Sequence, residues 1–429
     1  MGKNLLNGDI RRTLFIVALI SIALTAVSAR VDTRQGVFHP DFRSLQVTVN
    51  GNFMAAPVIM LNGDDRVVVT FDELGDERRY MRYELIHCGV DWQPEGLVDS
   101  EFLDGFNQGD VEEYEFSEAT TVHYVHYRIV LPDGRMRFTA SGNYLLRVYP
   151  ESDPDETLLQ ARFSVSEMAV GVSAGVTTAT DIDFNGGHQQ VELAVNVGEY
   201  PVEDLFNDLT VVVTQDGRVD NSVTLKQPLR LSGRQAVYEH LRPLIFNAGN
   251  EYRRFEIVST TYPSMGVEQV GYIDPFYHFT LGTDTPRAGE PYVYDQTQFG
   301  RYLVREYNSS HSDVQADYAV THFSLDMPEL EGYDVFIDGD LVNRRLDDSS
   351  LMSYNRATGR YEKALLLKQG SYNYQYLAVK RGGGVTGETT PVEGDKFQTQ
   401  HEYTINVYHR PRGTRYDRLI GTTTVYSNR

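Results

Sequence analysis

The fold of this chain is decided by the stretch Arg82–Pro132, which opens with RYELIHC (82–88) and closes with YVHYRIVLP (124–132). Successive side chains of a β-strand point to opposite faces, so a half-buried strand alternates apolar and polar residues. One face of the first run carries Tyr83, Leu85 and His87. One face of the second carries Val125, Tyr127, Ile129 and Leu131. Such faces need a second sheet to cover them, so the stretch predicts the centre of a β-sandwich.

Length and charge narrow the class of protein. A chain of 429 residues suits two to four domains with packed cores. Its formal net charge is −21, from 60 acidic and 39 basic residues. Phosphate contacts need Lys and Arg, so this balance disfavours a nucleic-acid partner. Beyond the N-terminal segment no apolar run is long enough to span a bilayer, and we expect no direct membrane insertion.

The first 29 residues have the three parts of a secretory signal peptide. Lys3, Arg11 and Arg12 give a positive start, an apolar run follows at 14–27, and small residues precede a cleavage site near Ala29. The apolar run is short for a membrane span. We therefore expect cleavage and export, and the alternative is an uncleaved N-terminal anchor.

From Arg30 onward, turn residues interrupt the sequence roughly every ten residues, and helical periodicity is nearly absent. This spacing is typical of an all-β fold. We predict a first sandwich at residues 30–166, a second at 167–281, a polar linker at 282–313 and a C-terminal sandwich at 314–429. The predicted fold class is thus all-β, with three tandem immunoglobulin/fibronectin-like sandwich domains.

The sequence contains no motif of a catalytic, metal or cofactor site. His123 and His126 are three residues apart, so in a strand they face opposite ways, and the single Cys88 cannot complete a zinc set. The run Asp338-Gly339-Asp340 lacks the features of a calcium loop. The glycines at 382–384 are followed by neither Lys-Ser nor a helical pattern, unlike a phosphate loop. We expect no enzyme activity, no cofactor and no metal.

Two groups of residues are candidates for a structural or an interface role. The first is His87, Cys88, Asp91 and Trp92, and the second is Tyr372, Tyr374 and Tyr376. A sandwich tryptophan usually fills the core and a lone cysteine in an apolar strand is usually buried, with partner contact as the alternative for each. The tyrosines share one strand face, which either packs on its own domain or stacks on a sugar or a partner. With 28 Tyr and 20 Phe, some aromatic surface should stay free for a protein interface.

The deciding stretch also resembles the first domain of the type IX secretion system plug proteins. The resemblance, within residues 40–165, rests on these motifs: Tyr83-x-Leu85-x-His87-Cys88-x-x-Asp91-Trp92, Glu101-x-x-x-Gly105-Phe106, and Tyr124-x-His126-Tyr127 before Pro132. Further motifs follow in the tail, at 359–362, 367–370, 374–376, 401–403 and 416–421. The middle of the chain matches by position alone.

The resemblance implies a periplasmic protein of Gram-negative bacteria that associates with the outer membrane through its partner. Plugs of this family close the periplasmic mouth of the large outer-membrane barrel of the translocon while no substrate is in transit. It therefore implies that barrel as partner and a binding role without catalysis, and we expect a monomer. The residues also allow an alternative, a periplasmic carbohydrate-binding or glycan-processing accessory protein whose exposed tyrosines stack on sugars.

Overall fold

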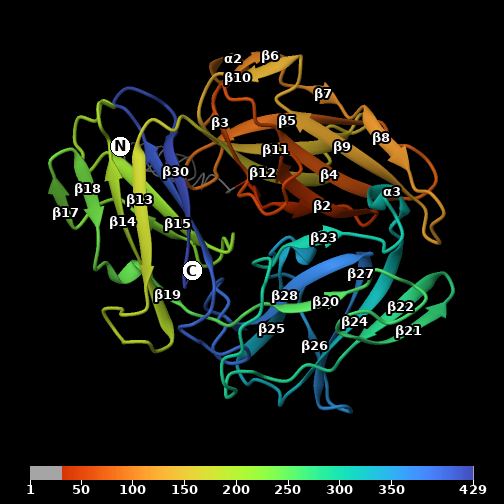
Figure 1. Cartoon of the computed structure of the whole chain (residues 1–429). Coiled ribbons are helices and arrows are strands. Elements are labelled where there is room, and N and C mark those ends of the chain that lie inside the picture. The colour runs from red at the N-terminus through yellow and green to blue at the C-terminus, as the bar shows by residue number, and fades with distance from the viewer. Residues whose placement is uncertain (1–30, 429) are drawn as a thin grey trace, which may run out of the picture. The chain divides into compact units, whose positions relative to one another are not determined.

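The computed structural model describes residues 31–428, and the chain from Arg34 onward forms one compact unit. The expected signal peptide at residues 1–29 lies outside the described residues. Strands make up nearly all of the regular structure, as Figure 1 shows, so the prediction of an all-β fold is confirmed. Three clusters of buried apolar side chains organise these strands into three sandwiches.

The first sandwich is built from residues 36–166. One sheet has the strand order β1-β12-β11-β5-β7 with β3 beside β12, and the other has the order β2-β4-β9-β8. The bounds are β1 Gly36–Val37, β2 Phe42–Val49, β3 Val58–Met60, β4 Val67–Leu74, β5 Met81–Cys88, β7 Gly109–Asp110, β8 Glu113–Phe116, β9 Tyr124–Leu131, β11 Gly142–Pro150 and β12 Leu159–Ser166. Between β5 and β7 lie α2 (Asp99–Phe102) and β6 (Leu103–Gly105). β6 pairs with β10 (Met136–Phe138).

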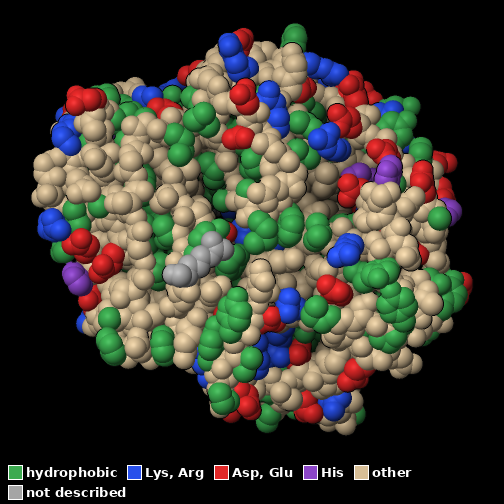
Figure 2. Space-filling view, in the orientation of Figure 1, with side chains coloured by type: hydrophobic (Ala, Val, Ile, Leu, Met, Phe, Trp, Pro, Cys, Tyr) green, Lys and Arg blue, Asp and Glu red, His purple; other side chains and the backbone are tan. Residues whose placement is uncertain are grey.

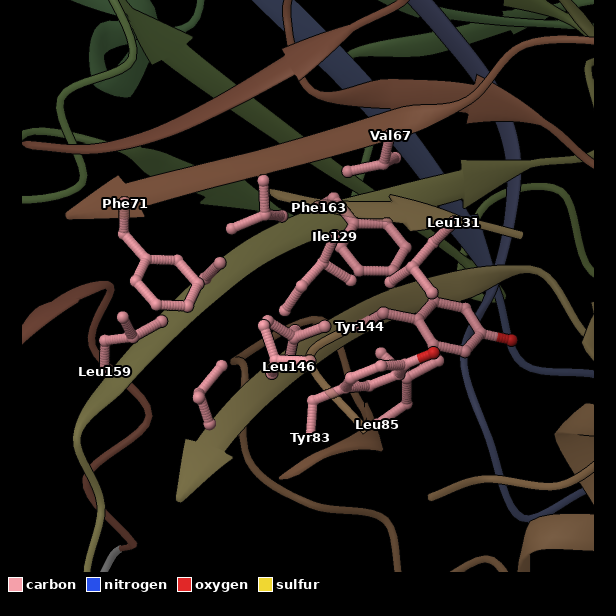
Figure 3. Packing of buried hydrophobic residues seen from close by; sticks show 14 of the residues in the cluster. Val67, Phe71, Tyr83, Leu85, Ile129, Leu131, Tyr144, Leu146, Leu159 and Phe163 are labelled. Carbon is pink, nitrogen blue, oxygen red and sulfur yellow. The ribbon is translucent and has the colours of Figure 1, made fainter. Parts of the chain in front are cut away.

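The alternation along β5 and β9 explains the first core. Tyr83 and Leu85 of β5 are buried, and the residues that alternate with them, Arg82, Glu84 and Ile86, are half-buried. Figure 3 shows side chains of both sheets meeting, among them Leu85 and Leu146 from one sheet and Phe71 and Ile129 from the other. Full burial of such a side chain contributes about 1.5–3 kcal/mol, so this cluster is the main stabilising element of the sandwich.

The second sandwich combines two parts of the chain that are far apart in the sequence. One sheet has the order β13-β14-β18-β17 with β19 beside β14, and the other has the order β16-β15-β29-β30. The bounds are β13 Gly171–Thr177, β14 His188–Asn196, β15 Leu209–Gln215, β16 Val223–Leu225, β17 Arg230–Ser232, β18 Gln235–Tyr238, β19 Ile245–Asn247, β29 Glu402–His409 and β30 Arg418–Tyr426. In Figure 1 the blue β30 accordingly lies among yellow and green strands.

The third sandwich is inserted between β19 and β29. Its sheets have the orders β20-β28-β23, with β25 beside β28, and β21-β22-β24-β27-β26. The bounds are β20 Arg253–Glu256, β21 Val267–Ile273, β22 Phe276–Leu281, β23 Tyr302–Val304, β24 Tyr318–Asp326, β25 Tyr333–Asp338, β26 Ser353–Asn355, β27 Arg360–Lys368 and β28 Gly370–Lys380. The remaining elements are the single turns η1 (Arg242–Leu244), α3 (Ser312–Gln315) and η2 (Asp340–Val342).

The grouping of strands differs from the consecutive domains predicted at 167–281 and 314–429. β29 pairs with β15 from Leu209–His409 to Gln215–Tyr403, so the C-terminal strands complete the second core rather than the third. The segment 282–313, predicted as a linker, contributes β23 to the third sandwich. Residue alternation reveals a strand but not its partner, which explains the difference. The domain limits, as units that fold independently, stay a prediction.

In the described part of the chain the helices are single turns. Within residues 31–428 none of them is long and apolar enough to cross a membrane.

Candidate functional site

His87 is the last residue but one of β5, and both nitrogens of its imidazole ring have a partner. Nδ1 is 2.9 Å from Glu95 Oε2, and Nε2 is 3.0 Å from the carbonyl oxygen of Ser141. Gly142 follows, with φ of +137°, and a Cβ there would come within 2.6 Å of the His87 ring. The ring also packs edge-on against Tyr144, with centroids 5.0 Å apart. The residue is thus packed into the fold, and its nitrogens are occupied.

Cys88 is buried, at 0% exposure. Burial, more than the nearby charges, raises the pKa of this thiol to about 12. A nucleophilic cysteine needs a thiolate at neutral pH, which this environment opposes. The structure therefore places Cys88 in the apolar interior, as one of its two interpretations expects.

Trp92 lies outside the core, which corrects its interpretation as a core residue. It has φ of +62° in the turn after β5, where its N–H donates to the Gly89 carbonyl over 2.9 Å. That turn leaves the indole half-buried, with the Arg162 guanidinium 4.5 Å from the ring centroid. Asp91 beside it is exposed and accepts a hydrogen bond from the Gln93 N–H. The backbone of Trp92 is thus held by the tight turn, and its indole ring contacts Arg162 rather than the hydrophobic core.

Tyr372, Tyr374 and Tyr376 are all buried in the third core, at 2, 3 and 0% exposure. The hydroxyls of Tyr374 and Tyr376 each donate to Asp284 Oδ2 over 2.7 Å, and that of Tyr372 donates to the Lys368 carbonyl. No ring face is left for stacking on a sugar. The packing interpretation of these tyrosines fits the structure, and the carbohydrate-binding alternative loses the residues on which it was based.

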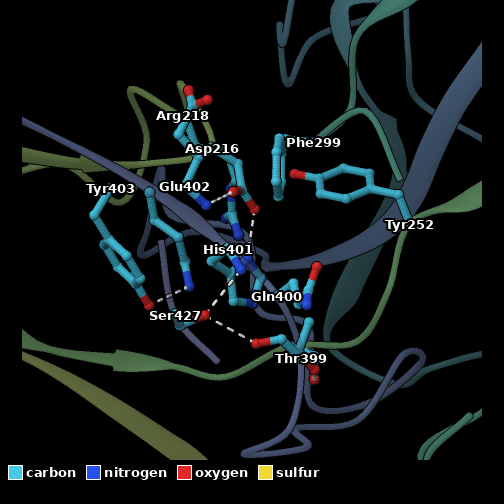
Figure 4. Close-up of polar contacts among 12 residues, drawn as sticks. Asp216, Arg218, Tyr252, Phe299, Thr399, Gln400, His401, Glu402, Tyr403 and Ser427 are labelled. Carbon is cyan, nitrogen blue, oxygen red and sulfur yellow. Dashed lines mark hydrogen bonds and ion pairs between the residues drawn. The ribbon is translucent and has the colours of Figure 1, made fainter. Parts of the chain in front are cut away.

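The second sandwich holds a buried Asp–His pair, shown in Figure 4, which the sequence analysis missed. His401 Nδ1 lies 2.6 Å from Asp216 Oδ2, and Nε2 lies 2.6 Å from the Ala248 carbonyl oxygen. Ser427 is nearby, but its Oγ accepts the backbone N–H of His401 and donates to the Thr399 carbonyl. A hydrolase needs the serine on the free ring nitrogen, so this arrangement is structural, not a nucleophilic triad.

Beside that pair, buried polar contacts join the second sandwich to the third. Arg301 Nη2 lies 2.6 Å from Glu402 Oε1, and both side chains are nearly or fully buried. Arg218 bridges Asp220 Oδ2 at 2.6 Å and the Gly387 carbonyl at 2.8 Å. The Asp220 carboxylate, for its part, accepts the N–H of Gly387. These contacts link loops of the second sandwich to the third.

The first sandwich is joined to the third by a buried ion pair. Lys368 Nζ at the end of β27 lies 2.6 Å from Asp72 Oδ2 in β4, and each side chain is 1% exposed. Asp72 also accepts from Tyr318 Oη over 2.6 Å, and its other oxygen is 2.6 Å from His126 Nδ1. The Tyr124 ring lies over the ammonium at 4.1 Å. Every polar atom of this contact is therefore satisfied.

The first and second sandwiches also meet through specific polar contacts. Tyr408 Oη of β29 donates to Asn143 Oδ1 of β11 over 2.8 Å, and both residues are buried. Nearby, the N–H of Val90 donates to Asp417 Oδ2 over 2.9 Å. Each pair of sandwiches thus shares at least one buried or half-buried polar contact.

The histidines offer no metal set. His126 pairs with Asp72 as described, and His123 pairs with a different carboxylate, that of Asp76. Over residues 31–428, no three His, Cys, Asp or Glu side chains lie together in a metal-binding arrangement.

An exposed aromatic surface lies on the first sandwich, and we name it the β8 patch. It consists of Tyr80, Tyr114 and Phe116, at 66, 37 and 49% exposure, with the Arg78 guanidinium 4.8 and 4.3 Å from the two tyrosine rings. β8 is the last strand in the order β2-β4-β9-β8, so it is an edge strand with β9 on one side. No motif in the sequence marks these residues as an exposed patch. The run EYEF (113–116) alternates like a half-buried strand, but all four residues are exposed.

The chain is similar to known proteins in its first sandwich and over most of its length. The model of the type 9 secretion system plug protein first domain matches residues 42–167, which is the first sandwich. Among solved structures, the chain is similar to a hypothetical protein from Parabacteroides merdae ATCC 43184, with 43% identity and a TM-score of 0.91 over 93% of this chain and 100% of that one.

Another similarity is too weak to carry an argument. It is to Pseudomonas fluorescens alkylpurine DNA glycosylase AlkC bound to DNA containing an abasic site analog, with 13% identity, a TM-score of 0.17, and coverage of 29% of this chain and 30% of that one. No curated protein matches the chain. The match over the first sandwich agrees with the resemblance in the sequence, and residues 42–167 of the chain belong to the family of type 9 secretion system plug protein first domains.

Proposed function

We propose that the chain, after signal-peptide cleavage, is a periplasmic plug that occludes the mouth of the type 9 translocon barrel while no substrate is in transit. The observation that carries this proposal is the family match over residues 42–167, which hold every strand of the first sandwich except β1. The role asks for a rigid body with a binding surface and for no reaction centre. The structure supports both requirements.

Rigidity is supported by the buried contacts that join the three sandwiches. The pair Lys368–Asp72 and the pair Arg301–Glu402 each lie almost entirely out of solvent. Removing one partner of such a pair typically costs about 3–5 kcal/mol, because the other charge is left buried and unpaired. Each charge has its partner in another sandwich, so these pairs fix how the sandwiches fit together. A body held in this way can block a pore without changing shape.

A role without catalysis is supported by the state of the reactive side chains. Cys88 is buried with a raised pKa, and the ring nitrogens of His87 and His401 already have partners. Ser427 faces backbone groups rather than an imidazole nitrogen. We infer that this chain acts by binding.

The β8 patch is the surface we assign to the translocon barrel. Exposed tyrosines, phenylalanine and arginine are the residue types enriched at protein interfaces. The free edge of β8 adds backbone donors and acceptors that a partner strand can use. On the face shown in Figure 2, acidic and basic side chains are interspersed, which suits a soluble surface with local binding patches.

The test is outer-membrane permeability in the native host. Deleting the gene should let a large dye enter cells that have the translocon, and should have no such effect in cells without it. Leakiness that does not depend on the translocon would overturn the proposal. The tagged chain should also co-purify with a very large outer-membrane barrel in mild detergent.

The assignment of the surface needs a matched pair of variants. When variant genes are returned to the deletion strain, the double variant Tyr114→Asp with Phe116→Asp should restore neither the permeability barrier nor co-purification with the barrel. Phe184→Asp, at an aromatic of the second sandwich that is even more exposed (78%), should restore both. If the β8-patch variant seals like the wild type, the barrel binds elsewhere.

A further inference from the structure

A cavity of about 500 Å³ lies between the first and third sandwiches. Its wall combines the segment 37–44 with the loop 341–349 and with β27. The volume falls within the range of roughly 300–1,000 Å³ that is usual for ligand sites. No residue of the β8 patch lines this cavity.

The charge of the cavity wall is opposite to that of the protein. Acidic residues outnumber basic ones by 60 to 39 in the chain, yet the wall includes four basic residues and no acidic one. The basic residues are Arg43, Arg345, Lys363 and Lys368. Two of them are already neutralised, Lys368 by Asp72 and Arg345 by Asp347, each at 2.6 Å.

The other two cations form no ion pair with a carboxylate within residues 31–428. Arg43 Nη1 donates to the backbone carbonyls of Pro40 and Phe42 over 2.5 and 2.6 Å, and Lys363 Nζ donates to that of Asp348 over 2.8 Å. Both are partly buried, and burial lowers the pKa of each. An anion in the cavity would therefore compensate two desolvated positive charges.

The cavity is bordered by the edge of β27 rather than by one of its faces. All six residues from Lys363 to Lys368 line it, whereas a strand face would contribute every second residue. β26 pairs with β27 at Arg360–Glu362 and stops there, and β24 covers the opposite edge along the whole strand. The edge from Lys363 onward therefore faces the cavity with no partner strand in the described structure. An unpaired edge offers backbone N–H and C=O groups to an extended peptide.

We propose that this cavity binds an extended acidic peptide, which adds as a strand to the edge of β27 and places carboxylates on Arg43 and Lys363. The charge of the wall selects acidic side chains, and the open edge selects an extended backbone over a compact anion. Apolar wall residues such as Val37, Phe38 and Leu341 receive the side chains that alternate with the carboxylates. This inference is independent of the plug role, since the cavity and the β8 patch share no residue.

The test is fluorescence anisotropy with the full mature chain. The probe is a fluorescein-labelled hexapeptide of alternating glutamate and valine, with both ends blocked. It should bind, and the same peptide with lysine in place of glutamate should not. An acidic peptide N-methylated at alternate backbone nitrogens should bind much more weakly, because it cannot pair with a strand edge. Succinate should compete poorly at equal concentration; if it binds as well as the peptide, strand addition is wrong.

Two sets of variants locate the site. Arg43→Gln with Lys363→Gln should weaken binding roughly tenfold or more, since hydrogen bonds between charged groups are lost. The matched control is Arg66→Gln with Lys226→Gln, which removes the same charges outside the cavity. Ala364→Trp keeps both cations but fills the cavity, and it should abolish binding even if the charge variant fails to fold. No binding by the wild type, or binding unchanged in Ala364→Trp, would overturn the proposal.

Discussion

At the scale of a single residue, His401 ties together parts of the chain that are 185 residues apart. Burial by itself lowers the pKa of this imidazole, but the Asp216 carboxylate and the Ala248 carbonyl raise it above its usual value. A raised folded-state pKa gives stability that is fully present below the unfolded-state pKa, about 6.5 for histidine. That stability is lost as the pH rises through the folded-state pKa.

The prediction for His401 concerns the pH dependence of the free energy of unfolding. Urea denaturation of the wild type between pH 6 and 9 should show a decrease as the imidazole loses its proton. His401→Gln should be less stable at pH 6 and should lack this decrease. His240→Gln is the matched control, because His240 also pairs with a carboxylate, that of Asp181, but is exposed. Equal pH dependence in wild type and His401→Gln would contradict the prediction.

At the scale of elements, β5 and β9 could be predicted from the sequence, because one face of each is apolar and buried. β28 was predicted as a strand, but its surroundings could not be. Its polar residues Asn373 and Gln375 are buried as fully as its tyrosines. Gln375 Nε2 donates to Tyr252 Oη and to Asp338 Oδ2, partners that are distant in the sequence. The alternation of tyrosines with polar residues therefore predicted the strand. It did not predict that the face with the polar residues is buried too.

A prediction at this scale concerns the two hydroxyls of β28 that share Asp284 Oδ2. Tyr374→Phe and Tyr376→Phe should each lower the free energy of unfolding by about 1.5–3 kcal/mol, the range for hydrogen bonds to charged groups. The double variant should lose more than the sum, because both hydroxyls share one oxygen and the remaining bond strengthens when the other is removed. The other oxygen of this carboxylate, Oδ1, lies 2.6 Å from Arg253 Nη1, and neither substitution removes this ion pair. A double-mutant cycle measures this. Strict additivity would mean that the two bonds are independent.

At the scale of the whole molecule, the sequence predicted an all-β chain and its family. It did not predict which distant parts of the chain pair with one another and join the sandwiches. The contacts that join the sandwiches pair residues far apart, such as Lys368 with Asp72 and Glu402 with Arg301. Single polar residues of this kind have no local pattern, so the sequence could not distinguish them from ordinary surface charges. The same holds for the cavity, whose cations stand out once both sandwiches are in place.

The last prediction distinguishes consecutive domains from the observed strand order. A fragment of residues 314–429 should not fold, because β29 is separated from its partner β15, and the fragment also lacks β20, β22 and β23 of the third core. A fragment that keeps both parts of the second sandwich, residues 167–250 joined by a Gly-Ser linker to residues 399–429, retains each strand of that core. Its amide NMR signals should be well dispersed, as in a folded β protein. The 314–429 fragment should aggregate or show the poorly dispersed amide signals of an unfolded chain. A folded 314–429 fragment would mean that β29 and β30 find an alternative partner within the third sandwich, and the inserted arrangement would then be wrong.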